Sequence, residues 1–311
     1  MAEVGLVYDD VFLRHETGAH PENKERVRRT WDFISAAPGL EHLKHLKPVP
    51  ATRQDLLLIH EAKYLDLLAG LPPDQYAALD PDTMVGPGSM EAAYSAAGAV
   101  MTAVGAVTEG ICEAAFCMVR PPGHHALPGR AMGFCVLNNI ALGAAYALER
   151  CGHGRVAIVD FDVHHGNGTQ AAFYEDDRVL FISLHQHPFY PGTGSAAETG
   201  SGRGEGKTLN FPLPGGSTEA VYLEALRKSI VPAVREHAPS LIMVSAGFDA
   251  HRADPIGGMR LESESYAKMT RIIMEMAGHS CSGKVVSVLE GGYNLDALAE
   301  SIGEHLTAMA G

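Results

Sequence analysis

Residues 156–168 read VAIVDFDVHHGNG, and this stretch decides the fold. It begins as a short run of apolar, β-branched residues, which is typical of a buried strand, and then delivers two carboxylates and two imidazoles before it turns at glycines. Polar side chains so dense at the end of a buried strand are costly unless something pairs with them. Asp162 and His164 offer an oxygen and a nitrogen ligand two residues apart, which indicates a divalent metal site, although the stretch by itself is also compatible with a solvated loop.

Three further segments repeat this pattern. Apolar runs at 115–119, 241–246 and 285–289 lead into RPPGHH, GFDAH and EGGYN, respectively. Open α/β sheets bind ligands in the crevice at the carboxyl ends of their strands, so we expect these four strand ends to meet at one edge of a sheet. The predicted site then contains the following side chains: His124, His125, Asp160, Asp162, His164, Asp249 and Tyr293.

Helical periodicity alternates with the apolar runs along the chain. Helices are predicted at about 22–36, 60–69, 89–109, 138–150, 218–237, 262–279 and 294–309, and further strands at 5–8 and 179–184. This alternation predicts an α/β fold in which residues 1–311 form a single domain of three layers, with a mainly parallel sheet between helices. The expected loops are 70–88, 123–133, 185–206 and 249–260, and the last three should form the rim of a pocket. The Ala- and Gly-rich stretch 92–107 is expected to be a buried core helix, too short to span a bilayer.

Composition excludes some classes of function. The chain has 311 residues, 46% of them hydrophobic, which is enough for a large core. A net charge of −13 without any block of basic residues argues against nucleic-acid binding, and no membrane partner is expected. Five cysteines without a CxxC pair indicate buried thiols in a reducing compartment. Because a strand is expected already at Gly5 and no signal peptide is evident, we expect a cytoplasmic protein.

Taken together, these motifs resemble the histone deacetylase family, the zinc-dependent acyl-lysine amidohydrolases of the arginase–deacetylase fold. The matching pieces occur in the family's order and are RPPGHHA at 120–126, GFC at 133–135, DFDVHHGNGTQ at 160–170, PGTG at 191–194, AGFDA at 246–250 and LEGGYN at 289–294. Six linked motifs are far more specific than a single short pattern. Asn167, and Glu290 before the paired glycines, are more similar to the class II and bacterial branch than to class I.

The resemblance implies one divalent ion per chain, Zn²⁺ or alternatively Fe²⁺ or Co²⁺, held by Asp162, His164 and Asp249. A ligand set without a thiolate argues against a purely structural zinc site. The resemblance also implies a structural K⁺ or Na⁺ in the neighbourhood of Asp160, Asp162, His164, Ser183 and Leu184.

The catalytic roles follow from the same resemblance. His125 is expected to be the general base, with Asn167 as its hydrogen-bond partner, because a neutral imidazole can take a proton from water and return it to the leaving amine. His124 is expected to pair with Asp160 as a charged imidazolium. Tyr293 should donate its hydroxyl to the developing oxyanion.

Four residues are implied as the substrate-binding set, with Gly133, Phe134 and Tyr190 lining a narrow acyl-lysine tunnel. Tyr190 stands where the family usually has Phe, which adds a hydroxyl to one tunnel wall. The fourth is Ile256, which follows Asp254-Pro255 at the position where polyamine-selective relatives can carry a Glu gatekeeper. An apolar residue there offers no partner to a second ammonium, which favours acyl-lysine in a peptide or protein as the substrate.

Three other functions are compatible with parts of this pattern. A deacetylase of acetylpolyamines or other small amides uses the same fold, and a non-enzymatic metal-dependent binding module would not need both tandem histidines. An arginase-like hydrolase is disfavoured because carboxylates for a second metal are not evident. Homo-oligomerisation stays open. The substrate's acyl length and the native metal are not fixed by the sequence.

Roles or locations can also be predicted for several polar residues outside the motifs. The resemblance implies that Arg26, which stands where the family has an arginine near the base of the tunnel, gates the exit of the acid product. Asp82 is either a rim anchor for the substrate backbone or a turn residue. The histidines expected at the surface are His42, His45, His60, His153, His237, His279 and His305, and those expected on rim loops are His185, His187 and His251.

Overall fold

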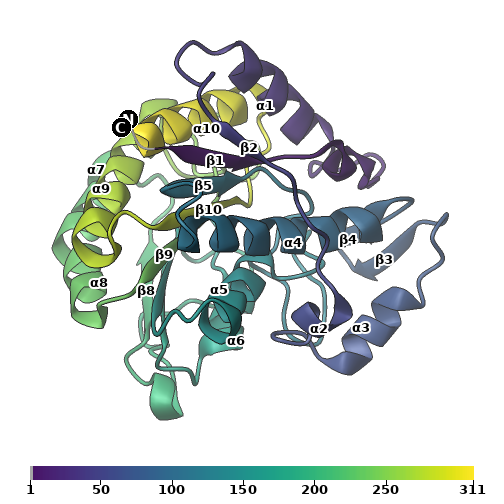
Figure 1. Ribbon diagram of the computed structural model, residues 1–311, viewed down its shortest axis with the longest axis horizontal. Coiled ribbons are helices and arrows are strands. Elements are labelled where there is room, and N and C mark those ends of the chain that lie inside the picture. Colours follow the sequence, from purple (N-terminus) through teal and green to yellow (C-terminus); the bar gives the residue numbers. More distant parts are fainter. Residues whose placement is uncertain (1–2) are drawn as a thin grey trace.

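Eight strands form one parallel sheet at the centre of the molecule in this computed structural model, which describes residues 3–311 (Figure 1). In spatial order they are β2 (Lys44–Leu46), β1 (Val4–Val7), β5 (Ala114–Cys117), β10 (Val285–Leu289), β9 (Leu241–Ala246), β6 (Val156–Asp160), β7 (Val179–Gln186) and β8 (Thr208–Leu213). Each neighbouring pair runs parallel. The predicted mainly parallel sheet is therefore confirmed. The expectation of no signal peptide rests partly on residues 1–2, which lie outside the described part.

Helices cover both faces of the sheet, so the predicted three-layer α/β/α architecture is confirmed (Figure 1). One layer contains α1 (Glu25–Ala36), α9 (Ser263–Cys281) and α10 (Leu295–Ala310), with α7 (Glu219–Ala225) and α8 (Val231–His237) packed on α9. The other contains α4 (Ser89–Thr108), α5 (Asn139–Arg150) and the short α6 (Asn167–Phe173). Asn138 and Asn294 cap α5 and α10, because each side chain accepts a backbone N–H of the first turn.

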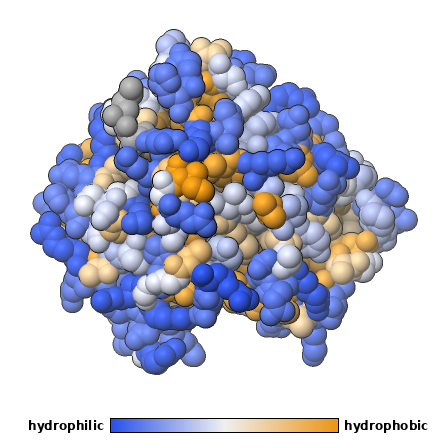
Figure 2. Space-filling model, viewed as in Figure 1, coloured by the Kyte–Doolittle hydropathy of each residue, from blue (hydrophilic) through white to orange (hydrophobic). Residues whose placement is uncertain are grey.

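The α4 helix is a core helix, as predicted. Its 20 residues are long and apolar enough to cross a membrane, so the expectation that this segment is too short was wrong. However, 72% of its apolar window is buried inside the protein, where it packs on α5 and β5. The face seen in Figure 2 is largely hydrophilic, with apolar side chains in small separate groups.

Some elements were not predicted. Segment 70–88, expected as a loop, contains the antiparallel hairpin of β3 (Ala77–Asp80) and β4 (Thr83–Val85). The β8 strand carries Pro212, which is tolerated because β8 lies at the edge of the sheet. The β8 strand itself was not predicted, and the remaining unpredicted elements are short, namely β2, α6, α2 (Arg53–Leu56) and helical turns at Asp10–Arg14 and Gly202–Gly204. The α3 helix (Ala62–Ala69) agrees with the prediction.

The four strands that carry the predicted site are neighbours in the middle of the sheet, in the order β5-β10-β9-β6. Their register aligns their carboxyl ends, since Leu289 lies opposite Ala246 and Asp160 lies opposite Ser245. The residues that follow each strand therefore emerge side by side at one edge, which is where open α/β sheets place their ligands.

Four histidines expected at the surface are buried, which corrects that prediction: His60, His153, His237 and His305. His305 is 1% exposed and lies between Thr270 Oγ1, 2.6 Å from its Nδ1, and Ser287 Oγ, 2.9 Å from its Nε2. Its ring also packs against Phe161, which is buried in the core. The hydroxyl groups satisfy both ring nitrogens, so a polar side chain fits the inner face of α10.

The burial of His305 predicts that stability depends on pH. Burial lowers the pKa of His305 to about 3, whereas a histidine in the unfolded chain has a pKa of about 6.5. Below pH 6.5 the unfolded chain binds a proton that the folded chain excludes, so this residue lowers the free energy of unfolding by about 2 kcal/mol at pH 5. Urea unfolding at pH 7 and pH 5 should show a smaller loss for His305→Gln than for the parent. His279→Gln, at an exposed position, should lose as much as the parent. An unchanged loss in His305→Gln would contradict this assignment.

Candidate active site

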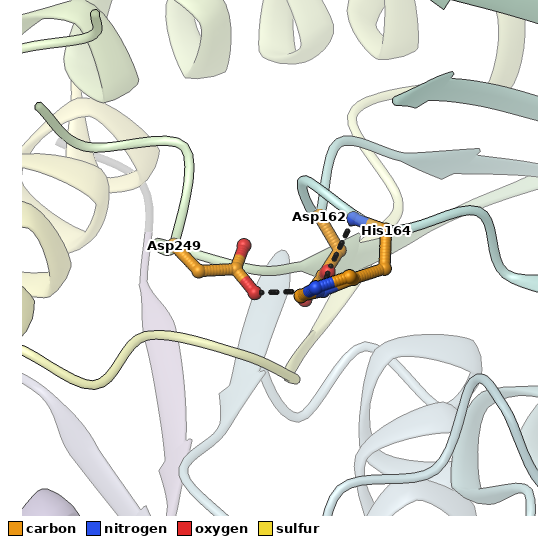
Figure 3. Close-up of side chains that lie close together, drawn as sticks. All are labelled: Asp162, His164 and Asp249. Atoms are coloured by element: carbon orange, nitrogen blue, oxygen red, sulfur yellow. Dashed lines mark hydrogen bonds and ion pairs between the residues drawn. The ribbon is translucent and has the colours of Figure 1, made fainter. Parts of the chain in front are cut away.

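The three predicted metal ligands lie together at the carboxyl ends of two neighbouring strands. Asp162 and His164 follow β6, and Asp249 follows β9. One ligand atom from each residue lies within 4.8 Å of the others, and all three side chains are buried. As Figure 3 shows, the carboxylates approach the same imidazole from two sides, with Nδ1 of His164 3.0 Å from Asp162 Oδ1 and 3.2 Å from Asp249 Oδ2.

The surrounding backbone holds both carboxylates in place. Gly291 donates its N–H to Asp162 Oδ2 at 2.8 Å, and Val163 donates its N–H to Asp249 Oδ1 at 2.9 Å. A side chain at Gly291 would occupy the space of both carboxylates, which explains why glycine follows Glu290 here. Asp249 Oδ2 is left buried without a hydrogen bond.

The charges of this cluster fit a cation. Burial and the neighbouring Asp162 raise the pKa of Asp249 to about 7, because two carboxylates share a space without water. Asp249 Oδ2 has no hydrogen bond, and its one charged neighbour is the His164 Nδ1 that it shares with Asp162, so a divalent ion would supply a partner for it. Two carboxylates and one imidazole, without a thiolate, are typical of a catalytic rather than a structural divalent site. These residues could therefore hold a metal ion.

The tandem histidines lie beside this cluster and have opposite electrostatic environments. His124 Nδ1 lies 2.9 Å from Asp160 Oδ2; although burial opposes the charge, Asp160 and Asp162 raise the pKa of His124 to about 10. The ring of His125 is 4.0 Å from that of His124, and its Nδ1 lies 2.7 Å from Asn167 Oδ1. Burial, together with the charges of His124 and His164, holds the pKa of His125 well below its usual value. These surroundings favour a neutral imidazole at His125 and a charged one at His124.

Tyr293 completes the group, because β10 delivers it beside the β9 loop. Burial raises the pKa of Tyr293 well above its usual value, so its hydroxyl stays protonated and can donate a hydrogen bond. The guanidinium of Arg26 lies 4.9 Å from the centre of the Tyr293 ring and donates from Nε to the Gly292 carbonyl at 2.6 Å. Arg26 is fully buried and supports this loop; its expected role as an exit gate stays a prediction.

A cavity of about 250 Å³ opens above these groups. All four predicted substrate-binding residues line it, with Phe134 edge-on to Tyr293 at 5.7 Å and Tyr190 edge-on to His125 at 5.2 Å. The cavity wall also contains residues that the sequence analysis missed: Pro122, Cys135, Phe189 and Gly291. Phe189 stacks on His164 at 5.3 Å, and the only sequence signal for it was a second aromatic residue beside Tyr190.

The unpredicted β3–β4 hairpin shapes one wall of this cavity. Asp82 Oδ1 accepts the Gly133 N–H at 3.0 Å, and Thr83 Oγ1 accepts the Phe134 N–H at 3.1 Å. Gly133 and Phe134 both have positive φ, of 58° and 68°, so the hairpin holds two consecutive left-handed residues. Asp82 lines the cavity and also lies in the hairpin turn, as the turn interpretation predicts; its role as an anchor for the substrate backbone stays a prediction.

One expectation about the histidines at the rim was wrong. His185 belongs to β7 and is buried, with Nδ1 2.9 Å from Ser183 Oγ and Nε2 2.9 Å from the Gly194 carbonyl. His251 is also buried. The monovalent cation expected around Asp160 and Ser183 stays a prediction.

Comparisons with known proteins agree with this geometry. Residues 20–309 match the sequence model of the histone deacetylase domain. A protein from Archaeoglobus fulgidus named "Probable deacetylase" is 43% identical over 94% of this chain and 82% of that protein. The "Histone deacetylase-like amidohydrolase" of Pseudomonas aeruginosa is 42% identical over 88% of this chain and 73% of that protein. A crystal structure of the HDA15 HD domain superposes with a TM-score of 0.94 at 36% identity, covering all of this chain and 90% of that one.

Proposed function

This chain belongs to the histone deacetylase family, and from that premise we propose that it is a zinc-dependent amidohydrolase that removes acetyl or other acyl groups from lysine side chains. The observation that carries the proposal is the buried cluster of Asp162, His164 and Asp249, whose His164 lines the same cavity as the tandem histidines. Membership of this deacetylase family supports hydrolase activity. The identity of the metal ion and of the substrate is what we propose.

An amide is a poor electrophile and water is a poor nucleophile, so catalysis must improve both. When bound to Asp162, His164 and Asp249, a divalent ion lowers the pKa of water to roughly 7 and polarises the substrate carbonyl. His125 is neutral and partnered by Asn167, so it takes the proton of the attacking water and returns it to the leaving amine. Tyr293 donates its protonated hydroxyl to the oxyanion of the tetrahedral transition state.

His124 acts through its charge. Its ring lies against that of His125 and its Nδ1 is held by Asp160, so the proton on His124 is retained. A fixed positive charge beside the reacting carbonyl favours the developing negative charge and keeps a second proton off His125. The pair therefore separates the tasks of base and electrostatic stabiliser.

The shape of the cavity supports an acyl-lysine substrate. The rings of Phe134 and Tyr190 both line it, and an unbranched alkyl chain fits between flat aromatic faces. Ile256 lies at the same cavity and provides no carboxylate for a second ammonium group. A small acylated polyamine is the second candidate, because the same chemistry would cleave it. We further propose a cytoplasmic location and no nucleic-acid or membrane partner.

Kinetics on an acetyl-lysine peptide and acetylspermidine test the substrate proposal. We expect kcat/KM for the peptide to be at least ~10-fold higher, a difference of about 1.4 kcal/mol in transition-state binding. Ile256→Glu should narrow or reverse this preference, because it supplies a partner for the distal ammonium. Ile111→Glu adds the same charge at an exposed position outside this cavity and should leave the preference unchanged. A parent enzyme that already prefers acetylspermidine would show that other rim residues set specificity.

A further inference from the structure

We propose that Asp254 is a positioning residue, whose carboxylate fastens the backbone of Tyr293 to the rim segment that carries Ile256. This inference rests on the proposed function, in which Tyr293 donates to the oxyanion. Asp254 lies in the segment that connects β9 to α9, and it is 8% exposed. It is not one of the three ligand candidates and does not line the cavity, and its direct link to the reacting groups is its hydrogen bond to the Tyr293 N–H.

One oxygen of Asp254 serves the loop after β10. Its Oδ2 accepts the backbone N–H of Tyr293 at 2.7 Å and that of Asn294 at 3.3 Å. The other oxygen serves the rim, because Oδ1 accepts the N–H of Ile256 at 2.9 Å and that of Gly257 at 3.2 Å. A single buried carboxylate thus receives four backbone N–H groups from two segments that are 36 residues apart in sequence at their nearest pair, Gly257 and Tyr293.

The loop that delivers Tyr293 needs such a fixed point. Gly292 has φ of 124°, a conformation that only glycine adopts readily, and the pair Gly291-Gly292 leaves the backbone before Tyr293 free to rotate. Arg26 holds the carbonyl side of this turn through Gly292, and Asp254 holds the N–H side at Tyr293 itself. Hydrogen bonds to a carboxylate are stronger than those between neutral groups. Asp254 therefore fixes the position of the Tyr293 backbone, from which the ring projects.

The arrangement also connects substrate contact with the catalytic hydroxyl. Ile256 lines the cavity, and its N–H shares a carboxylate with the N–H of Tyr293. A shift of the rim on substrate binding would be transmitted to Tyr293 through one side chain. Because a misplacement of about 1 Å at a reacting group costs up to ~10²-fold in rate, loosening this link should lower kcat more than it raises KM.

A double-mutant cycle tests the proposal in the metal-loaded, full-length enzyme. Asp254→Ala should lower kcat for the acetyl-lysine peptide by about 10-fold or more, with KM within about 3-fold and the metal content unchanged. In the Tyr293→Phe background the same change should lower kcat by less than about 3-fold, because the hydroxyl that it positions is already absent. Equal factors in the two backgrounds, or loss of the metal, would overturn the proposal.

Amide hydrogen exchange gives a readout that does not depend on activity. In Asp254→Ala the amides of Tyr293 and Asn294 should exchange faster than in the parent. Asp176→Asn is the matched control, because Asp176 also accepts a backbone N–H, that of Arg178 at 2.9 Å. Asp176 lies just before β7, at the amino-terminal end of the strand, whereas the active site lies at the carboxyl ends. This control variant should change neither this exchange nor kcat. Faster exchange in Asp254→Ala without a loss of kcat would also overturn the proposal.

Asp254→Asn serves if the alanine variant does not fold. Its amide has one oxygen, so it must give up either the rim or the Tyr293 side, and exchange at 256–257 and 293–294 shows which. We expect kcat to fall only when exchange at 293–294 rises, and any other pairing contradicts the inference. Failure of the proposed function looks different, since Tyr293→Phe would then leave the parent's turnover intact or no acylated amine would be cleaved.

Discussion

Asp249→Ala should leave the protein folded, unable to retain a divalent ion and at least ~10³-fold less active. The variant removes an oxygen ligand from a cluster of only three protein ligands, and it removes the one buried oxygen there that has no hydrogen bond. Changes outside the ligand set typically cost about 10–100-fold in metal affinity, so loss of a ligand should cost more.

Metal analysis after gel filtration of zinc-loaded protein measures this directly. The parent should retain one ion per chain and Asp249→Ala none. Zinc should raise the Tm of the parent and not that of the variant, because only a folded chain that binds the ion is stabilised by it. Asp66→Ala removes a carboxylate whose side chain is 68% exposed and should behave as the parent. One tightly held ion in Asp249→Ala would remove this residue from the site.

Tyr293→Phe and His125→Ala should each lower kcat by about 10² or more while the metal stays in place. Tyr293→Phe removes one hydroxyl from a ring that both Phe134 and Arg26 contact, so the ring should stay where it is. His125→Ala removes the base but leaves the ligand cluster, since no hydrogen bond joins His125 to Asp162, His164 or Asp249.

Metal content and kcat measured on the same samples separate these effects from loss of the ion. Tyr64→Phe is the matched control for the hydroxyl, because Tyr64 is buried and donates to the Val136 carbonyl away from the metal cluster. It should turn over at a rate near that of the parent. Near-parental turnover of Tyr293→Phe or His125→Ala on a substrate that the parent cleaves well would remove that residue from the mechanism.

The site was predictable from the sequence because its residues follow strands that are recognisable as short apolar runs. Asp160, Asp162 and His164 stand directly after an apolar run, as do Asp249 and Tyr293, and a parallel sheet brings such ends to one edge. The chemical roles of these residues, and the extent of one domain over residues 1–311, stay predictions. The arrangement of the side chains around His124 and His125 agrees with the environment expected for each.

What sequence reasoning missed depends on contacts between distant segments. Asp82 reaches the cavity on a hairpin of strands only four and three residues long, whose pairing no local pattern reveals. His305 is buried because Thr270 and Ser287 satisfy it, and both lie on other elements of the sequence. Asp254 and Phe189 act through neighbours that come together only in the folded chain. Local periodicity indicates which face of a helix is buried, but it does not indicate which residues from other elements pack against that face.

The place of β10 in the sheet has a consequence for the newly made chain. This strand is the last in sequence, yet it lies between β5 and β9 in the middle of the sheet. While a ribosome is still adding residues before Val285, β5 and β9 lack their common partner, and Tyr293 has not been synthesised. A nascent chain therefore exposes two unpaired central edges, a surface that chaperones recognise and that aggregates readily. The gap closes in a late step that joins both halves of the sheet, so catalytic competence and completed folding should arrive together.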